Sequence, residues 1–147
     1  MTAASPSSAP QLAGGAAPAH QVSILLYSDD LSTRDTVRAA VGRRPARDVE
    51  VTTWKECATP AAATEAVEAG GWDLLILDGE TSPIGGMGLN RQLQAEVTDC
   101  PPAIILTGRV QDNWLATWSL AAEAVPMPID PVTLADAVAR VARGEIA

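Results

Sequence analysis

The stretch "WDLLILD" (residues 72–78) places four consecutive apolar residues directly before an aspartate. A short apolar run without alternation is typical of a strand that is buried on both faces of a sheet. "VSILLY" (residues 22–27) and "AIILT" (residues 103–107) repeat this pattern. "VEVTTW" (residues 49–54) alternates as an edge strand does, and "AEAV" (residues 122–125) reads as a short strand. The sequence therefore predicts five strands.

A helical pattern follows each of these strands. Thr59-Pro60 predicts a helix start and Gly70-Gly71 its end, because Thr caps, Pro fits the first turn and Gly stops a helix. The other expected starts are Ser32, a position near Leu89, Asp112 and Asp130. Five strand-helix repeats predict an α/β fold: a doubly wound, five-stranded parallel sheet of the flavodoxin type, (βα)5, with right-handed crossovers.

The chain of 147 residues is long enough for one domain. Residues 1–21 are rich in Ala, Ser, Pro and Gly and predict a flexible tail, which leaves residues 22–147 as the folded domain. The formal charge of −8 argues against a nucleic acid partner. No apolar run is long enough to insert into a membrane, and the start of the chain lacks the pattern of a secretory signal. Cys57 and Cys100 suggest neither a disulfide framework nor a zinc site, so we expect a cytoplasmic protein.

Polar residues stand where the predicted strands end. Ser28 and Asp29 follow the first strand, Asp78 ends the third and Thr107 ends the fourth. Ligands of parallel α/β sheets bind at the carboxyl ends of the strands. Oxygen ligands of this kind suit Mg²⁺, for which Asp29 and Asp78 are the candidates. The alternative is that each residue is solvated at the start of a loop.

The motifs "ILLYSDDLSTR", "DLLILDGETSPIGGMG", "IILTG" and "PIDPVTLADAV" resemble the receiver domains of two-component response regulators. This resemblance spans residues 22 to about 143. It implies that Asp78 stands at the position of the aspartate that accepts a phosphoryl group from a histidine kinase. It also implies that Thr107 is the switch hydroxyl after strand four, and that Mg²⁺ is held by an acidic pair after strand one.

Three positions depart from the family pattern. Ser28 stands where the first member of the acidic pair belongs, and Met127 replaces the lysine of a Lys-Pro dipeptide. Ala124 stands where the family usually carries a switching Tyr or Phe. Phosphoryl transfer depends on electrostatic stabilisation, and a thioether supplies no positive charge. We therefore expect a degenerate receiver that is not an enzyme and requires no cofactor, with Mg²⁺ binding only if the acidic site is still competent.

Two groups of residues predict a protein interface. Trp114 and Trp118 lie four residues apart on a predicted helix, and at least one of them should face outward. Core packing is the alternative for either of them. Arg43, Arg44 and Arg47 form the concentrated basic patch "GRRPAR", for which a solvated loop is the alternative.

The motifs "LDGETSPIGGMG", "CPPAIILTGR" and "DNWLATWS" are most similar to a mycobacterial branch of single-domain receivers that associates with respiratory complex I. This resemblance implies an accessory subunit on the peripheral arm, at the inner face of the plasma membrane. Two alternatives stay open: a working stand-alone response regulator phosphorylated on Asp78, and a decoy that holds a histidine kinase.

Overall fold

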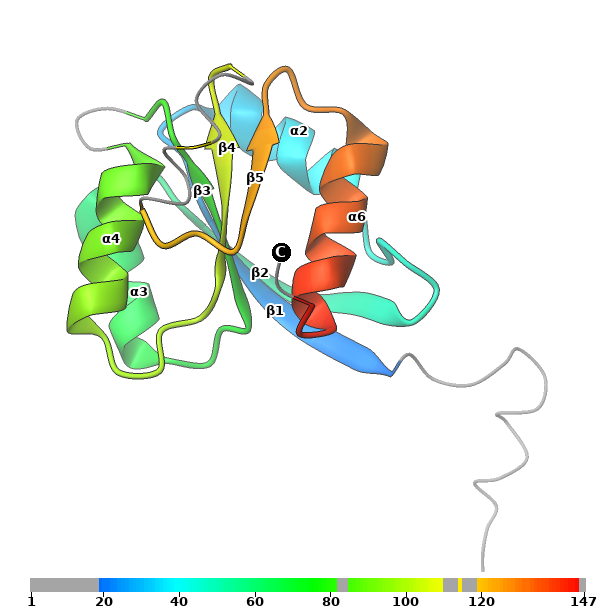
Figure 1. Cartoon of the computed structure of the whole chain (residues 1–147), viewed down its shortest axis with the longest axis horizontal. Coiled ribbons are helices and arrows are strands. Elements are labelled where there is room, and N and C mark those ends of the chain that lie inside the picture. Colours follow the sequence, from blue (N-terminus) through cyan, green and yellow to red (C-terminus); the bar gives the residue numbers. More distant parts are fainter. Residues whose placement is uncertain (1–18, 82–84, 110–113, 115–118, 146–147) are drawn as a thin grey trace, which may run out of the picture.

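The structure is a computed structural model, and it describes residues 19–81, 85–109, 114 and 119–145. Its described strands form one parallel sheet of five strands in the order β2-β1-β3-β4-β5 (Figure 1). The strands are β1 (His20–Tyr27), β2 (Val49–Cys57), β3 (Leu74–Asp78), β4 (Ala103–Thr107) and β5 (Glu123–Pro126). The predicted five-stranded, doubly wound α/β sheet is therefore confirmed, with β2 and β5 at its two edges.

Strand boundaries differ from the predicted ones by a few residues. β1 begins at His20, so it includes His20 and Gln21, which the sequence placed in the tail. β2 continues to Cys57 because the whole segment pairs with β1. β3 begins at Leu74 rather than at Trp72, whose indole N–H donates to the carbonyl of Ala66 in the preceding helix.

The helices of the described residues are α2 (Leu31–Val41), α3 (Pro60–Ala69), α4 (Gly86–Glu96) and α6 (Pro131–Ala142). Thr59 and Asp130 cap α3 and α6 as predicted, each accepting a hydrogen bond from a first-turn amide. The predicted cap of α2 is wrong: Asp30 accepts from the amide of Ser32, so Ser32 is already helical. The helix predicted at residues 112–121 falls largely outside the described residues, which hold only Trp114 and residues 119–121 of it.

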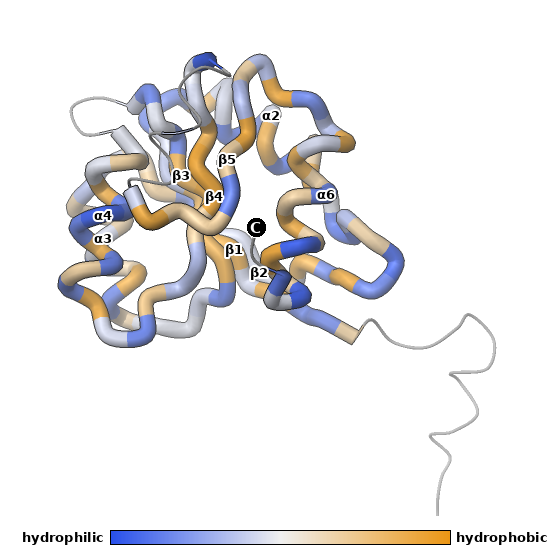
Figure 2. Tube along the Cα trace, in the orientation of Figure 1, coloured by the Kyte–Doolittle hydropathy of each residue, from blue (hydrophilic) through white to orange (hydrophobic). Residues whose placement is uncertain are grey.

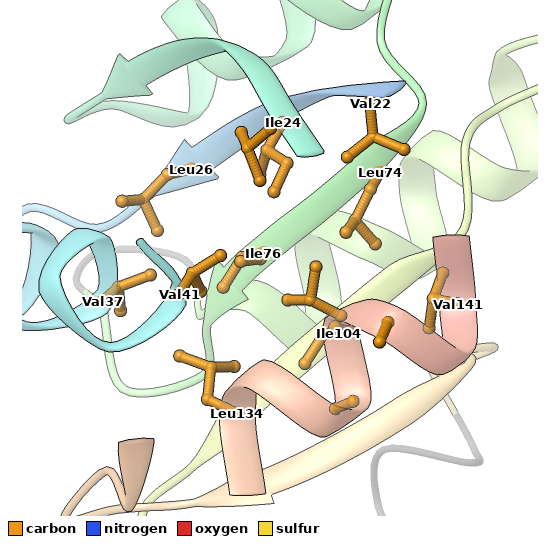
Figure 3. Close-up of a cluster of buried hydrophobic side chains, with 14 of the residues drawn as sticks. Val22, Ile24, Leu26, Val37, Val41, Leu74, Ile76, Ile104, Leu134 and Val141 are labelled. Atoms are coloured by element: carbon orange, nitrogen blue, oxygen red, sulfur yellow. The ribbon is translucent and has the colours of Figure 1, made fainter. Parts of the chain in front are cut away.

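The sheet separates two apolar clusters. α2 and α6 cover one face of the sheet, and α3 and α4 cover the other. Figure 2 shows that the central strands are among the most hydrophobic segments of the chain. Alternate residues of β3 serve the two sides: Leu74 and Ile76 contact the first cluster, and Leu75 and Leu77 the second. Figure 3 shows the first cluster, where Leu134 from α6 and residues of α2 converge on the strands. Burial on both faces explains why the central strands are continuous apolar runs. Among the described residues, no helix is long and apolar enough to cross a membrane.

Glycines allow α4 to pack directly against the end of β3. A Cβ atom on Gly86 would lie 2.8 Å from the Cβ of Leu77 and 2.9 Å from the carbonyl oxygen of Asp78. A Cβ atom on Gly85 would collide with the carbonyl oxygen of Gly79. The loop that follows Asp78 therefore requires glycine for close backbone approach.

This packing predicts opposite effects for the same substitution at two positions of α4. Gly86→Ala should lower the free energy of unfolding by about 1–3 kcal/mol, because the new methyl group overpacks a fixed backbone. Gly88→Ala, at an exposed position of the same helix, should raise it by about 0.5–1 kcal/mol through helix propensity. Urea denaturation of both variants checks this, and equal effects would contradict the close approach at Gly86.

Candidate functional site

Asp78 and Ser28 meet at the carboxyl edge of the sheet. Asp78 ends β3, and Ser28 directly follows the neighbouring strand β1. Both side chains are buried: Asp78 is 4% exposed and Ser28 is not exposed at all. The hydroxyl of Ser28 donates to Oδ2 of Asp78 at 2.8 Å. The amide of Glu80 donates to Oδ1 of the same carboxylate, also at 2.8 Å. Both carboxylate oxygens are thus hydrogen-bonded by the chain itself.

Ser28 is fixed through each of its polar atoms. Its amide donates to the carbonyl of Cys57 at the end of β2, and its hydroxyl accepts from the amide of Asp30. Its carbonyl accepts from Nη1 of Arg34 at 2.7 Å, and Nε of Arg34 donates to Glu56 at 2.9 Å. The hydroxyl therefore points at Asp78 with little freedom to turn away.

Thr107 and Met127 complete the same edge. Thr107 is fully buried at the end of β4, which pairs with β3 so that Asp78 stands opposite Leu106. The amide of Met127 donates to the carbonyl of Thr107 at 2.8 Å, just beyond β5. Met127 is partly buried and packs against the cluster covered by α2 and α6. Ala124 on β5 is also partly buried, but it packs on the side covered by α3 and α4. The residues predicted at the strand ends are therefore neighbours in space.

The acidic groups at this edge differ in one position from the magnesium site that the resemblance implies. Burial raises the pKa of Tyr27, and the charges of Asp29 and Asp78 raise that pKa further. Ser28, however, brings a hydroxyl donor to Asp78 where the family pattern has a third carboxylate. No group of three or more His, Cys, Asp or Glu side chains in the described part of the chain is arranged to hold a metal ion.

Glu80 adds a further negative charge to this edge of the sheet. Its carboxylate lies against Gly108, where a Cβ atom would come within 2.8 Å of Cδ of Glu80. Gly108 follows Thr107, so this carboxylate covers the end of β4 beside Asp78.

The predicted interface residues do not lie together. Arg43, Arg44 and Arg47 are exposed in the segment that precedes the edge strand β2. Trp114 is 68% exposed. It belongs to the segment that connects β4 to β5, and β5 is the edge of the sheet opposite β2. Trp118 lies outside the described residues. The outward orientation of Trp114 agrees with the requirement that one of the two tryptophans face solvent.

Sequence reasoning missed the contribution of Arg34 and Glu56. Their ion pair, with a second bond from Arg38 to Glu56 at 2.8 Å, braces the carbonyl of Ser28. These arginines lower the pKa of Glu56, the hydrogen bond from Arg38 contributing most. The available signal was Glu56 near the end of β2, 22 residues from Arg34 in the sequence.

Comparisons with known proteins fit this geometry. No family model matches the chain. Curated relatives from two strains of Mycobacterium tuberculosis, each described as an uncharacterized response regulatory protein, are 49% identical over 111 residues, which is 76% of this chain and 84% of theirs.

Solved structures show the same fold. A two-component response regulator of the LuxR family from Aurantimonas matches with a TM-score of 0.70 and 22% identity, covering 86% of this chain and 89% of that one. The receiver domain of the response regulator NarL from M. tuberculosis matches with a TM-score of 0.67 and 19% identity, over 85% and 98% of the two chains. The fold and the acidic strand end define a receiver domain. The chain belongs to the response regulator family.

The hydrogen bond to Asp78 predicts a stability effect. Ser28→Ala should lower the free energy of unfolding by about 1–3 kcal/mol, because it leaves a buried carboxylate oxygen without its donor. Ser23→Ala is the matched control on β1, since the Ser23 hydroxyl makes no hydrogen bond to the residues that the structure describes, and its amide bond to Asp73 is kept. The control should change stability by less than about 0.5 kcal/mol. Equal losses in chemical denaturation would contradict a structural role for the Ser28 hydroxyl.

Proposed function

We propose that this receiver serves as a binding module, an accessory subunit of a larger assembly, rather than as a phosphorylation switch. The observation that carries this proposal is the 2.8 Å hydrogen bond from Ser28 to Asp78. It occupies the carboxylate with an internal donor and replaces an acid of the family's metal site by a neutral group.

The charges around Asp78 support the same proposal. Phosphoryl transfer requires positive charge against the oxygens of the moving group. Met127 supplies none at the position where the family places lysine, and Glu80 adds negative charge at Gly108. The surface of the domain, by contrast, keeps features suited to docking, including the exposed indole of Trp114.

We further propose that the partner is the peripheral arm of respiratory complex I, reached from the cytoplasmic side of the plasma membrane. The support is the resemblance of "LDGETSPIGGMG", "CPPAIILTGR" and "DNWLATWS" to the mycobacterial branch that associates with that complex. The relatives from M. tuberculosis are named only as response regulatory proteins.

Affinity purification of the tagged chain from its native cells tests the partner. The proposal predicts stoichiometric recovery of NADH dehydrogenase subunits. The Met127→Lys variant should be recovered with the same subunits in nearly the same yield, because in this proposal the turn that follows β5 at Met127 has only a structural role. Elution of the chain alone would overturn the proposal, and recovery of a histidine kinase would favour a kinase-binding role.

The alternative is a stand-alone response regulator with Asp78 as phosphoacceptor. One arrangement favours it: Asp78 and Thr107 end the adjacent strands β3 and β4, as a phosphoacceptor and its switch hydroxyl must. In this alternative a histidine kinase is the partner and Asp29 and Asp78 hold Mg²⁺.

Incubation with acetyl phosphate and Mg²⁺, followed by intact mass measurement, separates the two functions. The binding-module proposal predicts no change in mass for the wild-type chain. The double variant Ser28→Asp, Met127→Lys restores the missing acid and lysine, and it should gain about 80 Da, the mass of one phosphoryl group. Adding Asp78→Asn should abolish that gain. A wild-type gain that Asp78→Asn removes would establish the alternative.

A further inference from the structure

A groove runs between α2 and the edge strand β2, away from the Asp78 site. Its volume is about 680 Å³, and its walls come from the second half of α2, the turn after it and four residues of β2, namely Glu50, Val51, Thr52 and Trp54. β2 is an edge of the sheet, so no further strand covers this side. Val51 and the half-buried indole of Trp54 contribute apolar surface to the groove.

Arg38 is held in place at one end of this groove. Its guanidinium lies over the Trp54 ring, 5.3 Å from the ring centroid, and its Nη1 donates to Glu56 at 2.8 Å. A planar guanidinium fixed by an aromatic ring and a carboxylate loses little entropy when it binds a further anion.

Arg43 stands at the other end with its binding groups exposed. Its Nε donates to Glu50 at 3.0 Å, and 84% of the Arg43 side chain is exposed against 14% of Glu50. The two terminal nitrogens of Arg43 make no hydrogen bond within the described part of the chain. They can therefore form the paired hydrogen bonds that a guanidinium offers to a carboxylate.

The charge of this surface differs from that of the whole chain. The groove is lined by two arginines, of which Arg43 is paired with the lining Glu50 and Arg38 with Glu56. Arg44 and Arg47 are exposed in the adjoining loop. The chain as a whole carries −8, which repels the continuous phosphate backbone of a nucleic acid. Arg44 and Arg47 leave an excess of positive charge beside the groove, and the groove itself offers the apolar surface of Val51 and Trp54. This combination matches carboxylates that flank an apolar side chain.

We propose that the groove between α2 and β2 docks an acidic segment of a partner protein, with carboxylates on Arg38 and Arg43 and an apolar side chain on Trp54. The inference rests on the proposed function, because it identifies the surface through which the binding module engages its assembly.

Amide NMR of the isotope-labelled full chain tests the groove with a defined probe. The probe is a short acetylated peptide of alternating Glu and Leu. We expect saturable shifts of the Trp54 indole N–H and of the amides that line the groove. Arg43→Glu, an exposed substitution, should weaken this binding by about tenfold.

Lys55→Glu is the matched control, because it changes the charge equally on the opposite face of β2, beside α3. It should change affinity by less than about twofold. Absence of shifts at Trp54, or equal weakening by Arg43→Glu and Lys55→Glu, would overturn the proposal. Binding of an oligothymidylate in the same groove with equal affinity would assign it to nucleic acid instead.

This assay contains no respiratory complex, so its failure is distinct from failure of the proposed function. In the co-purification experiment, loss of partner subunits with Arg43→Glu but not with Lys55→Glu is expected. Equal recovery with wild type and Arg43→Glu would show that the assembly docks elsewhere.

Discussion

The hydrogen bond from Ser28 to Asp78 joins the ends of two central strands in a sheet that is covered on both faces. The two faces are apolar, and the polar residues that end β1, β3 and β4 meet at the carboxyl edge. At that edge a buried carboxylate needs donors. The chain supplies these donors from the Ser28 hydroxyl and the Glu80 amide. A metal ion or a phosphoryl group that binds Asp78 has to compete with these two hydrogen bonds.

The surrounding contacts support this arrangement. Arg34 holds the Ser28 carbonyl and is itself held by Glu56, so the β1 end is tied to β2. Glu56 also pairs with Arg38, whose guanidinium stacks on Trp54 at the groove. The closed carboxyl edge and the proposed docking groove thus share one ion-pair network. In the proposed function the fold serves through its surfaces, and the Ser28–Asp78 hydrogen bond braces the carboxyl edge.

The sequence predicted those features that depend on local chemistry. The buried strands, the caps Thr59 and Asp130 and the glycine stop after α3 follow from residue type and short spacing. The cap of α2 was mispredicted because Asp30 and Ser32 both favour that role, and only the end of β1 decides between them. The Ser28–Asp78 bond spans 50 residues of sequence, so it depends on strand register that no local pattern contains. The bracing by Arg34 and Glu56 escaped prediction for the same reason.

The central claim is that Ser28 has replaced metal chemistry at Asp78 with an internal hydrogen bond. Titration of the full chain with Mg²⁺ and beryllofluoride, a mimic of the phosphoryl group, tests it most directly when followed through the backbone amides of Ser28, Asp78 and Thr107. The account predicts no saturable shifts for the wild-type chain and saturable shifts once Ser28→Asp and Met127→Lys are introduced. Saturable shifts of these three amides in the wild-type chain would contradict it.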